Sequence, residues 1–143
     1  MANATIERLT EKHTSPPAIG TLPIGAAKRV LKGVLVGIDA NGFVGEAGST
    51  GIVKILGMAS ATIDNRLGAA GDIMVDIQYG TFSWNNDTGS GAVKLGDIGK
   101  LCYAADNQTV SMVGTLVAGI VVDVNEKFVR VWSGPFVLNP PSS

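Results

Sequence analysis

The chain has 143 residues and a formal net charge of −1, and its composition is 45% hydrophobic but only 6% aromatic. That length favours one domain whose core is built mainly from aliphatic side chains. Scattered basic residues on a nearly neutral chain argue against nucleic-acid binding, and no apolar run reaches the roughly 18 residues that indicate a membrane-spanning helix. The single cysteine, Cys102, excludes an internal disulfide framework.

Residues 1–28 predict an extended amino-terminal arm. Thr5–His13 has the pattern of a turn or two of helix, and Ser15–Gly25 is expected to lack regular structure because its three prolines fix φ and remove donors. The arm is too apolar for a solvated tail, so we expect it to pack on its own domain or on a neighbouring protein. The residues expected to make these contacts are Ile6, Leu9, Pro16, Pro17, Ile19, Leu22, Pro23 and Ile24. A carboxy-terminal tail, residues 134–143, repeats this pattern with Phe136, Val137 and Leu138.

Residues 29–133 follow the strand period of two and predict an all-β domain, a small barrel or sandwich-like body. Arg29–Ile38 is expected to be a strand that ends in the hairpin turn Asp39–Gly42 (DANG), and Gly51–Ala59 is expected to be the next apolar strand. Within this domain, Asp64–Ala70 is the main candidate for a turn of helix.

A long strand is predicted over Asp72–Trp84. The apolar residues up to Tyr79 share one face of this strand, whereas Phe82 and Trp84 have the opposite parity. A glycine at such a change of phase is typical of a β-bulge, so we expect the strand to bend at Gly80.

The last third of the chain predicts short strands separated by tight turns. Leu101–Ala104 and Thr109–Val113 flank the hairpin turn Asp106-Asn107. Leu116–Val124 is nearly continuously apolar, and the turn Asn125-Glu126 leads into Lys127–Trp132, which alternates. Before them, Asn85–Gly91 (NNDTGSG) has the composition of an exposed loop.

Groups able to perform catalysis are sparse. The only histidine, His13, lies in the arm, where a general base cannot be held reliably beside a nucleophile. Asp72 and Asp76 are expected on the solvated face of a strand, and Cys102 is expected to be a buried, inert thiol. Gly89–Lys94 (GSGAVK) lacks the last glycine of a phosphate-binding loop. We therefore expect no catalytic residues, no metal and no cofactor, and a protein that is not an enzyme.

Three segments carry a resemblance to a known family: Gly33–Gly42 (GVLVGIDANG), Val75–Phe82 with the strand end GTFSWNN, and above all Gly96–Asp123, which opens with GDIGKLCYAADNQTVS. They are similar to the small β-rich decoration (cement, or head-stabilising) proteins of tailed-bacteriophage capsids. The resemblance covers roughly Arg29–Ser133 and rests on turns and strands rather than on a catalytic signature.

This resemblance implies a structural virion protein that binds the outer surface of the expanded capsid and stabilises it. Its partners would be the major capsid protein and further copies of itself, with a trimer favoured over a dimer by analogy. The protein would be made in the cytoplasm of the bacterial host and located on the capsid exterior. Its arms would contact the capsid, sister subunits or their own barrel, and neither nucleic acid nor a membrane is an expected partner.

The main alternative is a carbohydrate- or surface-binding β module of a phage fibre or tail. Such a module would bind through exposed aromatic side chains, for which Trp84, Tyr103 and Trp132 are the candidates. Two further alternatives are a barrel-sandwich carrier domain, for which no lysine at a hairpin tip is evident, and an enzyme whose site is shared between subunits.

Overall fold

The computed structural model describes residues 19–135, and their regular structure is almost entirely β-strand. The first half contains the strands β1 (Ile19–Pro23), β2 (Arg29–Val30), β3 (Leu35–Asp39), β4 (Val44–Glu46), β5 (Ile52–Ala59), β6 (Ile63–Asp64) and β7 (Met74–Gln78). The second half contains β8 (Gly80–Asn86), the 3-10 helices η1 (Gly89–Gly91) and η2 (Leu95–Asp97), and then β9 (Leu101–Ala104), β10 (Thr109–Ser111), β11 (Val117–Val124) and β12 (Val129–Ser133). The all-β prediction is confirmed. Over residues 19–135, no helix has the length and apolar character needed to cross a membrane.

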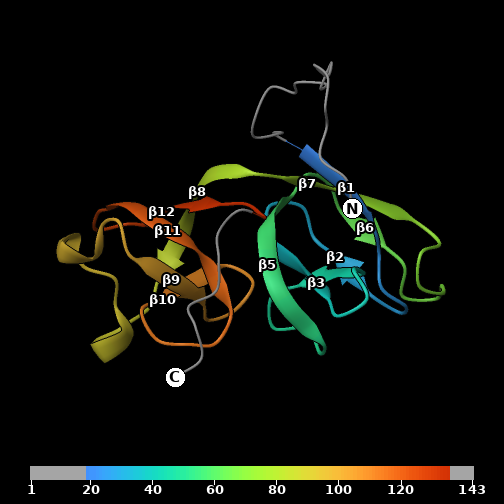
Figure 1. Cartoon of the computed structure of the whole chain (residues 1–143), viewed down its shortest axis with the longest axis horizontal. Helices are drawn as coiled ribbons and strands as arrows, with labels where there is room; N and C mark the ends of the chain where they lie inside the picture. Colours follow the sequence, from blue (N-terminus) through green and yellow to red (C-terminus); the bar gives the residue numbers. More distant parts are fainter. Residues whose placement is uncertain (1–18, 136–143) are drawn as a thin grey trace, which may run out of the picture.

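The second half closes into a barrel with the strand order β10-β8-β12-β11-β9, which we call the C-terminal barrel. Its neighbours are antiparallel except for β10 and β8, which are parallel. In Figure 1 its strands β9 to β12 are coloured from gold to red, and β8 is yellow-green. The side chains of β12 alternate between the barrel interior and the solvent. Val129 and Val131 are fully buried, while Arg130 between them is exposed.

The first half forms a five-stranded sheet in the order β1-β7-β5-β3-β4, accompanied by the two-stranded sheet β2-β6. The larger sheet curls until its edges meet at one point. Ile24, just after β1, forms an isolated parallel bridge with Val44 of β4, and the Gly25 N–H donates to the Val44 carbonyl over 2.9 Å. We call these two sheets the N-terminal half-barrel, because a single bridge rather than a ladder joins the edges.

Strand β5 separates the two cores and contributes to both. Register shifts against β3 mark two bulges in this pairing. Successive side chains of a strand point to opposite faces. Ile55 thereby packs into the C-terminal barrel, and Leu56 packs into the half-barrel. Gly37 of β3 lies opposite these bulges, where a Cβ atom would overlap the Lys54 carbonyl oxygen. In Figure 1, β5 stands between the two halves.

Each core is built from aliphatic side chains, as the composition predicts. The core of the C-terminal barrel contains Leu35, Ala47, Ile52, Ile55, Trp84, Val93, Cys102, Val110, Ala118, Val121, Val129 and Val131. The core of the half-barrel contains Ile24, Val30, Val36, Val44, Leu56, Ala59, Val75 and Ile77. Burial of each large aliphatic side chain stabilises the fold by about 1.5–3 kcal/mol.

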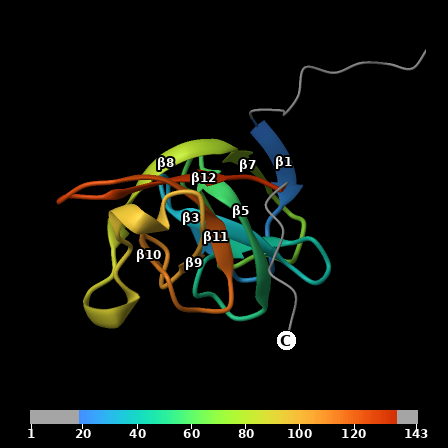
Figure 2. The ribbon, with the colours of Figure 1, turned by 60° about the vertical axis from the view of Figure 1, so that its left-hand side comes forward.

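The predicted bend at Gly80 is present, but it separates two strands instead of kinking one. Strand β7 ends at Gln78 and β8 begins at Gly80, which has a φ of 153°. The change of phase is also present, because Val75 and Ile77 face one core and Trp84 faces the other. This joint therefore carries the chain from the half-barrel to the barrel, and Figure 2 shows β7 and β8 following one another across the molecule.

The prediction that Ser15–Gly25 lacks regular structure is wrong, because Ile19–Pro23 forms β1. An edge strand needs hydrogen bonds on one side only, so the missing donor of Pro23 is tolerated at its end. Part of the segment predicted as an arm, Ile19–Pro23, is therefore a strand of the larger sheet. The strand expected over Arg29–Ile38 is interrupted after Val30, where Gly33 adopts a φ of 85°.

Two further expectations differ in detail. Asp64–Ala70 contains no helix, and the helical turns of the described residues lie in η1 and η2 instead. Asn85 and Asn86, expected in a loop, complete β8. Asn86 stays ordered there because its side chain accepts from the Val93 N–H at 2.8 Å and donates to the Val93 carbonyl at 2.9 Å.

The three predicted hairpin turns are confirmed and share one mechanism. The side-chain oxygens of Asp39, Asp106 and Asn125 each accept a hydrogen bond of 2.8 Å from the backbone N–H two residues further on. These turns connect β3 to β4, β9 to β10 and β11 to β12.

Candidate interaction surfaces

Of the amino-terminal contact residues predicted from the sequence, Ile19, Leu22 and Pro23 lie in β1, and Ile24 directly follows it. Ile24 is fully buried in the core of the half-barrel, so its side chain packs on its own domain and is not available to a partner. Leu22 and Pro23 are half-buried, whereas Ile19 is 53% exposed. The other predicted contacts lie outside the described residues: Ile6, Leu9, Pro16, Pro17, Phe136, Val137 and Leu138.

Strand β1 is an edge strand with one side paired to β7. The Ile24 N–H donates to the Ile73 carbonyl over 2.9 Å. In an antiparallel pair every second residue directs its backbone N–H and C=O groups to the neighbouring strand, so these groups of Gly20 and Leu22 face β7. The backbone groups of Ile19 and Thr21 point away from β7. Tyr79 covers Gly20, where a Cβ atom would overlap the tyrosine hydroxyl. The strand carries no charged side chain, and charge is the usual protection of a sheet edge.

A second surface is the loop between β6 and β7, residues 65–72, which we call the Leu67 loop. Leu67 at its tip is fully exposed, at 105% of the reference area. Asn65 at its base is buried, and its amide donates to the carbonyls of Gly25 and Ala69 over 3.0 and 2.9 Å. Asp72 accepts from the Ala69 N–H over 2.9 Å, so two side chains brace the loop from within.

Asp64 and Arg66 fix the entry of the Leu67 loop. The arginine Nε and Nη2 donate to the two carboxylate oxygens over 3.0 and 2.8 Å, and the Arg66 backbone N–H donates to the same carboxylate. These hydrogen bonds and the guanidinium charge lower the pKa of Asp64 to about 2. Both side chains are exposed, so the pair orients the loop more than it stabilises the fold. A surface hollow of about 500 Å³ is lined by Asp64, Arg66 and Leu67.

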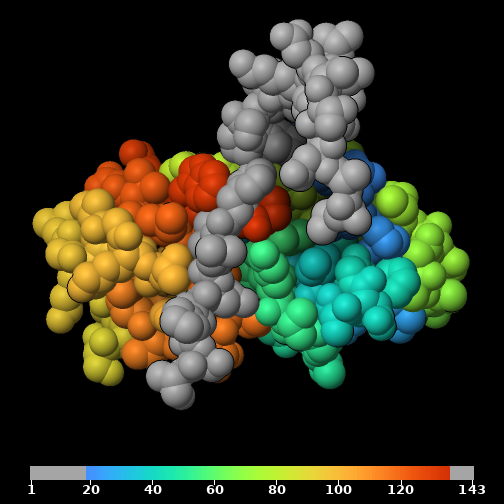
Figure 3. Space-filling model, viewed as in Figure 1, coloured from blue at the N-terminus to red at the C-terminus, as the bar shows by residue number. Residues whose placement is uncertain are grey.

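The opposite end of the molecule exposes another apolar group, around η2. Leu95 is 68% exposed, and Ile98 and the bulged residue Val122 of β11 are about half exposed. Figure 3 shows this end in gold on one side, and the Leu67 loop in yellow-green at the far end of the long axis. Each end of the molecule thus presents a leucine to solvent.

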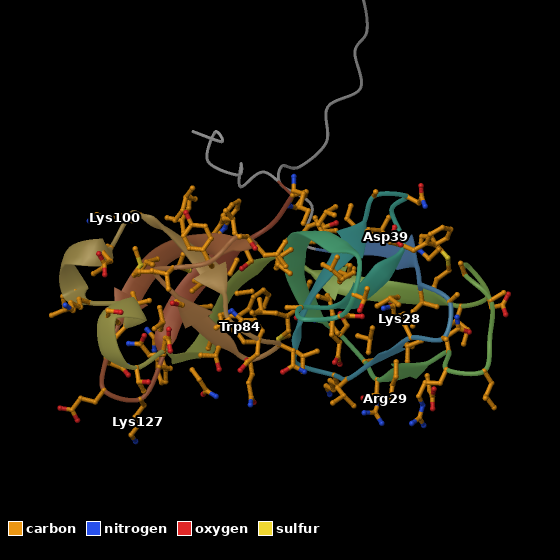
Figure 4. The ribbon with its side chains drawn as sticks, turned by 90° about the horizontal axis from the view of Figure 1, so that it is seen from below. Lys28, Arg29, Asp39, Trp84, Lys100 and Lys127 are labelled. Carbon is orange, nitrogen blue, oxygen red and sulfur yellow. The ribbon has the colours of Figure 1, made fainter. Side chains whose placement is uncertain are left out.

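The basic side chains of the half-barrel differ in how they are held. The Lys28 ammonium donates to the Ser49 hydroxyl at 2.5 Å and to the Thr50 carbonyl at 3.2 Å. Arg29 of β2 is exposed and makes no ion pair with a described residue. Figure 4 shows Lys28 lying against the body and Arg29 pointing away from it.

The residues considered for chemistry have structural surroundings. Cys102 is fully buried, and burial raises the pKa of its thiol to about 12, which leaves it an unreactive thiol at neutral pH. Asp72 braces the Leu67 loop, and Asp76 accepts from the Thr21 hydroxyl over 2.7 Å. Within residues 19–135, no three His, Cys, Asp or Glu side chains are grouped to hold a metal ion.

The aromatic residues proposed for a carbohydrate face do not form one together. Trp84 is only 4% exposed, and its ring meets Phe82 edge-on with centroids 6.2 Å apart. Figure 4 shows Trp84 in the interior of the body. Tyr103 and Trp132 are half-buried on other strands, so stacking of a sugar on all three residues is not possible.

Sequence reasoning found the β1 residues but missed the Leu67 loop, because Asp64–Ala70 was interpreted as a helical turn. The available signal was the set of Asx residues around Gly68, namely Asp64, Asn65 and Asp72. Such side chains compete with helix formation by bonding to the nearby backbone. Comparisons of this chain with protein-family models, with curated proteins and with solved structures gave no match.

Proposed function

We propose that this chain is a structural protein that decorates the outer surface of a tailed-bacteriophage capsid and stabilises the expanded shell. The proposal rests on the sequence resemblance, to which the fold adds a β-rich body with closed and curled sheets. Its partners would be the major capsid protein and other copies of itself. The carbohydrate-binding alternative loses its principal residue, because Trp84 is part of the core.

A structural feature that agrees with this proposal is the position of residues 1–18, which continue directly into β1. These residues include the apolar Ile6 and Leu9 and continue directly into Ile19, which is exposed at an uncharged sheet edge. A segment joined to a firmly paired strand is tethered at a fixed point, and its apolar residues then reach a neighbouring surface at a high effective concentration. This arrangement suits a protein that binds a large surface without enclosing a ligand.

Binding of this kind stabilises a shell by mass action. A protein that binds only the expanded lattice lowers the free energy of that state, by about 2.7 kcal/mol per site when its free concentration is 100 times Kd. Copies joined in an oligomer add avidity, so each contact can remain modest.

The test is cosedimentation of the purified full chain with empty capsids of the phage that encodes it, in the expanded and the unexpanded form. We expect saturable binding to the expanded shell at a fixed ratio to the capsid protein. An absence of binding to both shells would discard the proposal and would direct the search to glycans.

The arm is tested by exchanging its apolar residues while leaving β1 intact. The double variant Ile6→Ser/Leu9→Ser should weaken binding to the expanded shell at least 10-fold, since two buried aliphatic side chains are lost. The matched control Thr5→Ser/Thr10→Ser changes neighbouring residues of the same segment and should bind like the parent chain. Equal binding by both variants would show that the arm does not anchor the protein.

A further inference from the structure

Asn41 is the only asparagine of the sequence that precedes a glycine, and it lies in the hairpin turn between β3 and β4. The residue is exposed, and its side-chain amide makes no hydrogen bond with any residue of the described range 19–135. Other asparagine side chains are held in place by hydrogen bonds, namely those of Asn65, Asn86, Asn107 and Asn125. The Asn41 side chain is therefore free to turn toward its own backbone.

The group next to the Asn41 side chain along the backbone is the Gly42 nitrogen. Glycine has no Cβ atom to crowd this nitrogen, and no atom lies within 4 Å of the place where a Cβ would stand. Asn85 is also exposed, but it precedes Asn86, whose side chain is fixed to the Val93 backbone. Among the described asparagines, Asn41 thus has the backbone neighbour most open to attack its side-chain carbonyl carbon.

Asp39 holds this turn closed. One oxygen of its carboxylate accepts from the backbone N–H groups of Asn41 and Phe43, over 2.8 and 3.0 Å. The Asp39 carbonyl accepts from the Gly42 N–H over 3.0 Å, so the nitrogen that would react is engaged in the closed turn. The turn has to open locally before this nitrogen is released, and the hydrogen bonds to Asp39 set how often that happens.

We propose that Asn41 is a site of spontaneous deamidation and that Asp39 controls its rate. The Gly42 nitrogen loses its proton to solvent and attacks the Asn41 side-chain carbonyl carbon. The new carbon–nitrogen bond closes a five-membered succinimide, and the bond to the side-chain nitrogen breaks, so that ammonia leaves with a proton from water. Water then opens the ring at either carbonyl and gives an aspartyl or an isoaspartyl residue, in both cases with one added negative charge.

The isoaspartyl product acts on the closure of the half-barrel. Its backbone runs through the former side chain and is longer by one carbon atom. That extra atom lies in the turn that sets the pairing of β3 with β4, in which Val44 is the partner of Ile38. Val44 also forms the single bridge to Ile24 that joins the edges of the larger sheet. A shift of β4 should therefore weaken this bridge and loosen the half-barrel before the C-terminal barrel.

The experiment follows the full chain during incubation at mildly alkaline pH and locates the modification by peptide mass spectrometry, as the replacement of an amide NH2 by OH. Asp39→Ala removes the carboxylate that accepts two turn hydrogen bonds, so it should speed deamidation of Asn41 about 10-fold. The matched control is Asp106→Ala, which removes the corresponding hydrogen bond to Gln108 in the β9–β10 turn and should leave the rate at Asn41 unchanged.

Two measurements do not depend on the folding of these variants. In the parent chain the rate at Asn41 should rise with pH, by up to about 10-fold per unit, because the attacking nitrogen must lose its proton. Hydrogen exchange of the isoaspartyl form should show protection lost in β4 and beside Ile24. Asn41→Asp adds the charge without the extra backbone atom and should keep that protection.

The outcomes that would overturn the proposal are distinct. Deamidation that begins at Asn85, or a parent chain in which Asn41 reacts only after denaturation, would show that Asn41 is not a site in the folded protein. Equal rates in Asp39→Ala and Asp106→Ala would remove the role of Asp39. Unchanged protection of β4 in the isoaspartyl form would separate the modification from the closure of the half-barrel.

Discussion

The two halves of the molecule use the same aliphatic residues but close their sheets differently. In the C-terminal barrel every strand has a neighbour on both sides, so no edge is left. In the N-terminal half-barrel the edges are joined by the single bridge between Ile24 and Val44, and the outer side of Ile19–Pro23 is open near its start. The two halves thus differ in the backbone groups that they leave unpaired at a sheet edge.

The division has a physical basis in β5. Side chains of β5 enter both cores, Ile55 on one side and Leu56 on the other, so the two cores share this strand. A change in the half-barrel core should loosen that half first, whereas the closed ladder should resist local opening.

Among the changes considered, replacing Ile24 by alanine should lower the free energy of unfolding most, and it should act first on the half-barrel. Ile24 is fully buried and also forms the bridge that joins the sheet edges, so Ile24→Ala should cost about 2–5 kcal/mol of unfolding free energy. Denaturant unfolding measures the cost. Amide hydrogen exchange should show protection lost first in β1, β4 and β7. The control Ile19→Ala, at an exposed position of the same strand, should change stability by no more than about 0.5 kcal/mol. Uniform loss of protection in both halves would contradict the division.

The closed barrel should be destabilised by an added methyl group where β11 and β12 approach closely. Gly119 of β11 lies where a Cβ atom would overlap the Trp132 carbonyl oxygen of β12, so Gly119→Ala should destabilise the protein by about 1–3 kcal/mol. The matched control is Gly96→Ala in η2, where nothing lies within 4 Å of the added methyl group. Thermal unfolding of the two variants compares them directly, and equal midpoints would show that β11 can move away from β12.

The turns of this fold and the joint at Gly80 could be predicted from the sequence because they depend on local chemistry. Asp39, Asp106 and Asn125 were sufficient to locate three hairpins, because an Asx side chain bonds to the backbone two residues on whatever the rest of the chain does. The break at Gly80 was equally local, since parity changes there. Local chemistry of this kind can be read without a structure.

The features that could not be predicted depend on contacts between distant residues. Ile19–Pro23 forms a strand only because β7 offers it a paired side, and nothing within residues 15–25 indicates that partner. The bulges of β5 follow from the close approach of Gly37, which is distant in sequence. For the candidate surfaces, Ile19 was found from apolar character alone, but the exposure of Leu67 depends on Asn65 reaching Gly25.

The joint between the halves should be tested next, with a smaller effect expected. Gly80 has a φ of 153°, a conformation that β-branched residues avoid, so Gly80→Val should cost about 1–3 kcal/mol. Thr81→Val introduces the same side chain one residue further along β8, where the strand favours it, and should be nearly neutral. Urea denaturation of both variants gives the difference. A neutral Gly80→Val would mean that the joint can relax into an ordinary extended backbone.

The smallest effect on stability is expected at the Asp64–Arg66 pair of the half-barrel. This pair lies on the surface, so a change of pH tests it without altering either core. Folding lowers the pKa of Asp64 from 3.8 to about 2, chiefly through the hydrogen bonds from Arg66. A carboxyl group whose pKa is lowered by folding stabilises the native state above pH 3.8, and that contribution is lost as the pH falls toward 2. NMR titration of the side-chain carboxyl should therefore give a pKa of about 2 in the parent chain. In Arg66→Met the pKa should be higher but still below 3.8, because the backbone N–H of residue 66 continues to donate to the carboxylate.

Arg29→Met is the matched control for that titration, because Arg29 acts on Asp64 only through its charge and is the last of the contributing causes. It should leave most of the pKa shift in place. If Arg66→Met titrates like the parent chain, the bidentate pair does not persist in solution. The Leu67 loop would then be held only by the hydrogen bonds of Asn65 and Asp72.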